Sequence, residues 1–134
     1  MSDQELMKAA EEARKNAYAP YSGFLVGAAL LTKSGKVYTG CNIENASYTP
    51  TNCAERTAFF KAVSEGERAF DAIAVVGGKG ETPSEFCAPC GVCRQVMAEF
   101  CDKDFRVVLG NAEKIAVYKL QDLLPLSFSS EDLK

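Results

Sequence analysis

Histidine is absent from this sequence of 134 residues. Its absence excludes the Ser–His and Cys–His arrangements that many hydrolases use for nucleophilic catalysis. It also excludes histidine as a metal ligand. Any catalytic or metal-binding chemistry must therefore rest on other side chains.

The sequence also lacks long apolar segments and clusters of basic residues. No apolar run approaches the length of a membrane-spanning helix, and residues 1–5 show neither the basic nor the apolar part of a secretory signal. We therefore expect a cytoplasmic protein with no membrane partner. In that compartment six cysteines indicate metal binding and buried thiols rather than disulfides.

Charge argues against a nucleic-acid partner. The formal net charge is −3, and the fifteen lysine and arginine residues are scattered along the chain. Binding to phosphates depends on clustered basic side chains, so a polynucleotide is an unfavourable substrate. A hydrophobic content of 47% and the absence of repeats or low-complexity segments indicate one ordinary globular domain spanning residues 1–134.

Hydrophobic patterns predict a mixed α/β fold. Ser2 and Glu5 form a capping box that opens a helix ending near Tyr18. Residues 77–81 are rich in glycine but lack the spacing of a phosphate-binding loop, so we expect a mobile loop there. The predicted elements are strands at 24–32, 37–43, 72–76, 106–109 and 115–118, helices at 54–63 and 90–101, and a helical turn at 120–124.

The order of these elements predicts how the strands pair. The first two strands form a hairpin, and the strand–helix–strand segment 37–76 predicts a right-handed crossover with parallel pairing. The strand at 106–109 should likewise be parallel to its predecessor, whereas the short link before 115–118 predicts an antiparallel pair. The expected result is a three-layer α/β domain with a mixed five-stranded sheet and helices on both faces.

Cysteines occur at the start of both central helices. Cys53 precedes one helix, and Cys90 and Cys93 lie one turn apart at the start of the other. Helix N-termini favour thiolate over thiol, and three cysteines can hold zinc while leaving its fourth position to water. Arg56 and Arg94 could offset the charge of the thiolates. Glu55, two residues after Cys53, is placed to transfer protons.

Three other interpretations fit the same residues. Glu55 could only complete a capping box with Asn52. Cys87 could join the other three cysteines in a closed structural zinc site. Cysteines at 87, 90 and 93 could instead belong to an iron–sulfur site, although no fourth ligand stands at a matching spacing.

Several motifs together resemble the zinc-dependent cytidine deaminases of the small homotetrameric type. These are Asn42–Tyr48, Cys53–Ala58 and Pro89–Gln95, and the resemblance extends over nearly the whole chain. It implies one zinc per subunit and hydrolytic deamination of cytidine and 2′-deoxycytidine in pyrimidine salvage. Cys87 departs from the simplest pattern of that family, and we expect it not to be a ligand.

The resemblance also implies roles for individual residues. Glu55 would carry the protons, Cys53, Cys90 and Cys93 would bind zinc, and Arg56 would tune its charge. Asn42 and Glu44 would bind the ribose hydroxyls, although taken alone they are also typical of a polar turn. The remaining expected substrate contacts are Phe24 packing on the base, the N–H of Ala54 holding the pyrimidine carbonyl, and Tyr48 and Phe128 reaching the site.

Phe128 lies in a polar tail, residues 126–134, where no core of its own chain is evident. A domain of this size has little surface left to enclose a nucleoside by itself. The family resemblance therefore implies a homotetramer in which the tail contacts a neighbouring subunit. Two other activities compete with nucleoside salvage: deamination of another cytosine compound, such as a nucleoside antibiotic, and editing of polynucleotides.

Overall fold

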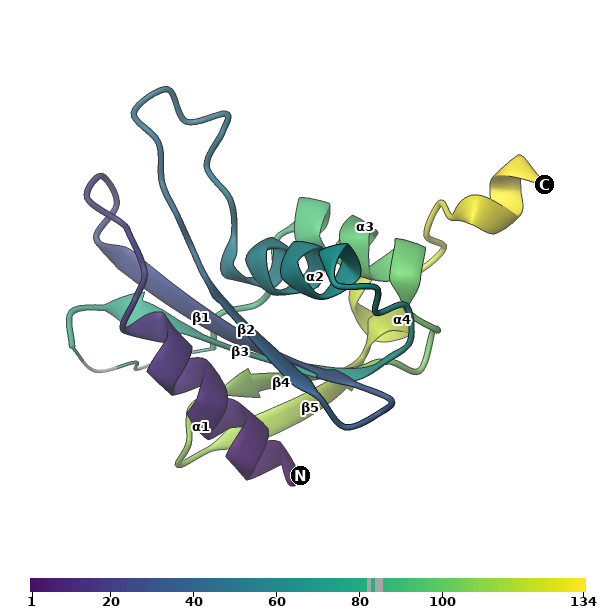
Figure 1. Ribbon diagram of the computed structural model, residues 1–134, viewed down its shortest axis with the longest axis horizontal. Helices are drawn as coiled ribbons and strands as arrows, with labels where there is room; N and C mark the ends of the chain where they lie inside the picture. Colours follow the sequence, from purple (N-terminus) through teal and green to yellow (C-terminus); the bar gives the residue numbers. More distant parts are fainter. Residues whose placement is uncertain (82, 84–85) are drawn as a thin grey trace.

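A five-stranded sheet with helices on both faces forms the body of the protein, as a computed structural model of residues 1–81, 83 and 86–134 shows (Figure 1). The strand order is β2-β1-β3-β4-β5. This arrangement confirms the predicted three-layer α/β fold. The elements are α1 (Asp3–Arg14), β1 (Phe24–Thr32), β2 (Val37–Cys41), α2 (Ala54–Ser64), β3 (Phe70–Lys79), α3 (Gly91–Phe100), β4 (Arg106–Gly110), β5 (Ile115–Lys119), α4 (Leu120–Leu123) and the 3₁₀ helix η1 (Ser130–Leu133).

Two hydrophobic clusters lie on opposite faces of the sheet. Successive side chains of a strand point to opposite faces, so Ala28 and Leu30 of β1 join one cluster and Ala29 and Leu31 the other. The helix α1 covers one face, and α2 and α3 cover the other (Figure 1). Strands buried on both faces read as continuous apolar runs, which is why β1 and β3 were visible in the sequence.

Two glycines let the helices approach the sheet closely. A Cβ atom added at Gly40 in β2 would lie 2.5 Å from the carbonyl oxygen of Ala54 in α2. One added at Gly27 in β1 would lie 2.1 Å from the carbonyl oxygen of Ala10 in α1. Since both contacts are with helix backbone, a larger residue would displace the helix. Gly40 therefore helps to set the position of the first turn of α2.

The pairing predicted for the crossover is wrong in one respect. The strands β2 and β3 do run in the same direction, but β1 lies between them and pairs antiparallel with each. β1 is buried on both faces over most of its length, and a central position gives it a partner on each side. The parallel pair β3–β4 and the antiparallel pair β4–β5 are as predicted.

The largest differences from the predicted boundaries are at the ends of α1 and β3. The helix α1 ends at Arg14 rather than near Tyr18, because Tyr18 forms a bridge with Ile43 beside the sheet. β3 runs on to Lys79, so its two glycines at 77 and 78 belong to the strand rather than to a loop. They are held there by pairing with Val26 and Leu25 of β1.

Arg14 is a buried cation in the α1 layer that the sequence did not reveal. Its guanidinium donates hydrogen bonds to backbone carbonyl oxygens of Leu25, Gly78, Gly80 and Glu81, at 3.0, 2.6, 2.7 and 3.3 Å. The planar group has five N–H donors and so can serve several acceptors at once. Arg14 thereby ties α1 to the ends of β1 and β3.

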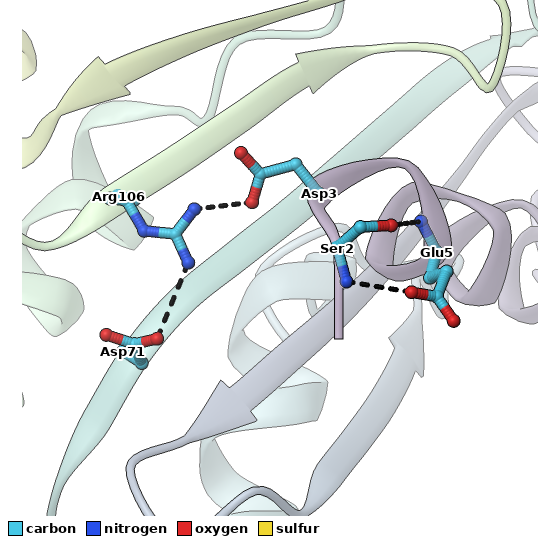
Figure 2. A network of polar contacts seen from close by, with 5 residues as sticks. All are labelled: Ser2, Asp3, Glu5, Asp71 and Arg106. Carbon is cyan, nitrogen blue, oxygen red and sulfur yellow. Dashed lines mark hydrogen bonds and ion pairs between the residues drawn. The ribbon is translucent and has the colours of Figure 1, made fainter.

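A second arginine fixes the opposite end of α1. Figure 2 shows Arg106 of β4 between Asp3 of α1 and Asp71 of β3, with the Ser2–Glu5 capping box alongside. The capping box was predicted from the sequence, and the structure confirms it. The ion pairs were not predicted, because their partners come from three separate elements. Both aspartates are partly exposed, so each pair contributes only about 1 kcal/mol or less.

The C-terminal tail leaves the body of the protein after α4 and ends in η1 (Figure 1). Leu126, Phe128 and Leu133 are exposed there. Among the residues that the structure describes, the helices are too short or too polar to cross a membrane.

Candidate metal centre and active site

The cysteines of the metal centre occupy the N-cap positions of two helices. Cys53 is the N-cap of α2 and Cys90 that of α3, with Cys93 in the first turn of α3. Asn52 was expected to cap α2, but its side-chain N–H donates to Thr57 Oγ1 at 3.1 Å. Glu55 is consequently one residue too early to close a capping box, which removes that interpretation.

The three sulfur atoms converge on one point. Cys53 Sγ lies 3.8 Å from Cys90 Sγ, which lies 3.6 Å from Cys93 Sγ, and all three are within 4.8 Å of one another. Tetrahedral zinc with Zn–S bonds of about 2.3 Å requires sulfur–sulfur distances of roughly 3.8 Å. The donor set therefore fits zinc in both chemistry and spacing. The convergence predicted from the two helix starts is confirmed.

Arg56 contacts this cluster, whereas Arg94 does not. Nη2 of Arg56 donates a hydrogen bond to Cys53 Sγ at 3.1 Å, which places a positive charge beside the thiolate. Arg94 instead donates to the carbonyl oxygens of Pro89 and Leu123, at 2.7 and 2.6 Å. Arg94 therefore braces the start of α3 against α4, and the charge-offsetting role considered for it from the sequence is wrong.

Hydrogen bonds from Cys93 and Arg56 lower the pKa of Cys53, which favours its thiolate form. The same contact with Cys53, together with burial and the neighbouring negative charges, raises the pKa of Cys93. Three like charges at these distances repel one another strongly in a low-dielectric site. A dication at the centre of the cluster removes that conflict.

Glu55 lies in the first turn of α2, and only 5% of its surface is exposed. Burial raises the pKa of Glu55 to about 7, and the negative charge of Cys53 acts in the same direction. A carboxyl group with a pKa near 7 can both accept and donate a proton at neutral pH. Ala54, beside it, is fully buried, and as the first residue of the helix it has an N–H without an intrahelical partner.

Cys87 packs beside the cluster but does not belong to it. The group of thiols able to share a metal comprises Cys53, Cys90 and Cys93 among the described residues. Burial raises the pKa of Cys87 to about 11, so its thiol is neutral. A Cβ atom at Gly77 would lie 2.8 Å from Cys87 Sγ and 3.0 Å from Phe24 Cε1. Phe24 and Cys87 therefore lie side by side over the end of β3.

A cavity of about 350 Å³ lies in the loops that precede β1 and follow β2, lined by Tyr21, Ser22, Glu44, Tyr48 and Thr51. The rings of Tyr21 and Tyr48 meet edge to face, with centroids 6.5 Å apart. Glu44 and Tyr48 were predicted as substrate contacts, whereas Tyr21, Ser22 and Thr51 were missed. The proline and tyrosines before β1 indicated only the end of a helix, so the sequence carried no signal for them.

The remaining predicted contacts lie outside the lining of this cavity. Asn42 is buried, and its amide bridges to β1 by accepting from Val26 N at 2.9 Å and donating to Phe24 O at 2.8 Å. Phe128 is 60% exposed in the tail, where its carbonyl oxygen accepts a hydrogen bond from Gln95.

Three thiols spaced for zinc and a buried carboxyl group two residues from one of them define the class of this site. It is that of a zinc-dependent enzyme with a carboxyl group beside the metal ligands. Comparison with known proteins identifies the family within that class. The sequence model described as "Cytidine and deoxycytidylate deaminase zinc-binding region" matches residues 1–110.

Individual proteins match this sequence over nearly the whole chain. The sequence is 56% identical to a cytidine deaminase of Halalkalibacterium halodurans, covering 99% of this chain and 98% of that protein. It is 53% identical to one from Sporosarcina psychrophila, covering 99% and 96%. A crystal structure of cytidine deaminase from Burkholderia pseudomallei is 53% identical and superposes with a TM-score of 0.87, covering 96% of this chain and all of that one.

The chain belongs to the family of zinc-binding cytidine and deoxycytidylate deaminases. This assignment confirms the family, the deaminase chemistry and the zinc cofactor expected from the motifs. It also rules out the iron–sulfur interpretation of the cysteines.

We predict that Cys87→Ser retains one zinc per chain, because the Cys87 thiol is neutral and outside the cluster. Cys90→Ser should lose most of its zinc under the same conditions, since it removes one of three ligands. Metal content measured after gel filtration distinguishes the two variants. Comparable zinc loss in both would assign Cys87 to the ligand set.

Proposed function

We propose that this protein hydrolyses free cytidine and 2′-deoxycytidine to uridine and 2′-deoxyuridine, releasing ammonia, in pyrimidine salvage. The observation that carries the proposal is the placement of Glu55, buried in the same helical turn as one of three converging thiols. The relatives over 50% identical are named cytidine deaminase, which supports the choice of substrate.

Zinc held by Cys53, Cys90 and Cys93 would supply a Lewis acid that makes water nucleophilic toward C4 of cytosine. Glu55 accepts a proton from the attacking water and delivers it to the ring nitrogen. The same carboxylate then takes the proton of the hydroxyl group formed at C4 and gives it to the amino group, so that the C4–N bond breaks, C4 becomes a carbonyl carbon and ammonia leaves. Its pKa of about 7 suits both directions of transfer.

Several chain groups would hold the nucleoside. We assign the pyrimidine carbonyl to the N–H of Ala54 and the face of the base to Phe24, which is 37% exposed at the start of β1. Glu44 and Asn42 would bind the ribose hydroxyls. The Asn42 Nδ2 group has two hydrogens, and only one is needed for its bond to Phe24, so the other can reach a hydroxyl.

A glutamate exchange tests the chemistry directly. Glu55→Gln keeps the side-chain volume but removes the proton carrier, so kcat should fall by about 10³-fold or more while zinc is retained. Release of ammonia and metal content are the measurements. The control is Glu99→Gln, which makes the same change at an exposed position of α3 and should leave kcat unchanged.

Full activity of Glu55→Gln would contradict the mechanism and favour a structural role for the metal. A panel of free cytosine compounds, including nucleoside antibiotics, identifies the substrate. Lack of turnover of cytidine by the wild-type protein would reject the proposed substrate. Tight, salt-dependent binding of single-stranded DNA or RNA would instead favour the editing alternative.

We assign Arg56 the task of offsetting thiolate charge, because its guanidinium contacts Cys53 Sγ. Three thiolates around zinc leave a net negative charge, which opposes removal of a proton from water. Arg56→Gln should therefore move the acid limb of the pH–rate profile to higher pH, with zinc content unchanged. An unchanged profile would leave Arg56 without this role.

We further propose that residues 1–134 act as one cytoplasmic domain within a homotetramer. The support is the exposed apolar surface of the tail and of the helices near the site, formed by Phe60, Val92, Leu126, Phe128 and Leu133. In this arrangement Phe128 enters the site of a neighbouring subunit, and Tyr48, exposed at the cavity, reaches across the same boundary. The tail segment 126–134 thus contributes to substrate binding in trans.

Removing the tail tests the shared site. Phe128→Ala, and truncation after Pro125, should each raise KM for cytidine by about tenfold, because an apolar wall of the site is lost. Leu133→Ala provides the control, since it removes another exposed apolar residue of the same tail. Light scattering coupled to gel filtration should give the mass of a tetramer. A fully active monomer, or unchanged KM after truncation, would contradict the proposal.

A further inference from the structure

The Glu44 carboxylate is held by the short segment that precedes β1. Its Oε1 accepts hydrogen bonds from the backbone N–H groups of Tyr21 and Ser22, at 3.0 and 3.1 Å. Its Oε2 accepts a third bond from the Ser22 hydroxyl. These residues are 22 and 23 positions from Glu44 in the chain, so the contact joins two separate loops.

The third bond differs in its effect from the first two. Rotation about the last torsion of a glutamate is broad and weakly restricted, so bonds to one oxygen alone leave the plane of the carboxylate free to turn. A donor on the other oxygen fixes that plane. The hydrogen bond from the Ser22 hydroxyl also lowers the pKa of Glu44, which favours the ionised form that can only accept hydrogen bonds.

Ser22 also connects Glu44 to the start of β1. Its Oγ accepts a hydrogen bond from Phe24 N at 3.0 Å while donating to Glu44. One hydroxyl thus links the carboxylate in the cavity to the aromatic residue assigned to the base. A carboxylate has about four acceptor positions, of which three are used here, so one on Oε2 remains for a further donor.

We propose that Ser22 is a positioning residue that fixes the plane of the Glu44 carboxylate, so that its remaining acceptor position receives a 2′- or 3′-hydroxyl of the substrate sugar. Ser22 thereby sets the selectivity for nucleosides that carry these hydroxyls. The inference rests on the proposed function. It does not depend on how many subunits assemble.

The test compares two substrates with and without the hydroxyls concerned. For Ser22→Ala, KM for cytidine should rise about tenfold with kcat changed less than twofold, since a hydrogen bond to a charged group is lost or misdirected. KM for 2′,3′-dideoxycytidine, which offers no such donor, should change less than twofold. The ratio of kcat/KM values for the two substrates therefore falls about tenfold.

Three further variants separate positioning from simple stability. Ser22→Thr retains the hydroxyl and should restore the wild-type ratio. Ser34→Ala removes a hydroxyl from the β1–β2 turn, away from the cavity, and should leave the ratio unchanged. In a Glu44→Ala background, adding Ser22→Ala should have no further effect on the ratio, because the group that it positions is gone.

Equal losses of kcat/KM for both substrates in Ser22→Ala would overturn the inference and make Ser22 a structural residue of the turn. An unchanged ratio would overturn it too. So would a further tenfold effect in the Glu44→Ala background. Failure of the proposed function appears separately, as a wild-type protein that turns over neither nucleoside.

Discussion

Mutual repulsion of three sulfur ligands is the constraint on which this structure depends. Their sulfur atoms lie within 4.8 Å of one another, and each metal-binding thiol must lose its proton. Placing them at the N-termini of α2 and α3 supplies favourable helix dipoles. Arg56 adds a positive charge on one side. The close contact of α2 with Gly40 and the hydrogen bond from Arg94 to Leu123 in α4 help to fix the positions of the two helix N-termini.

The parts of the fold that the sequence predicted are those set by local or periodic signals. The capping box at Ser2, the apolar runs of β1 and β3, and the cysteines at two helix starts each depend on neighbouring residues alone. The same reasoning failed where two adjacent residues could each serve as the N-cap of a helix. Both Asn52 and Cys53 could begin α2, but Asn52 pairs with Ile43 and its side chain donates to Thr57, and the helix begins one residue later.

Local and periodic sequence patterns did not predict the contacts between distant parts of the chain. The place of β1 between β2 and β3 depends on the burial of both its faces, which pairwise strand rules do not consider. The bonds from Tyr21 and Ser22 to Glu44 use mainly backbone N–H groups, which every residue other than proline carries. For that reason the side-chain types predicted the chemistry of the site, but they did not predict the shape of the cavity.

The ion pairs of Arg106 have a practical consequence for attaching the protein to a surface or a fusion partner. They hold the start of α1 near Asp71, at the beginning of β3 (Figure 2). Phe24 and Cys87 lie over the other end of β3, at Gly77. About 20 Å of strand separates the two ends. A linker joined to Met1 therefore emerges on the side away from the cysteine cluster and leaves the route of small molecules to it open. A linker joined to Lys134 would instead be attached to the tail segment that contains Phe128, and could obstruct its contacts.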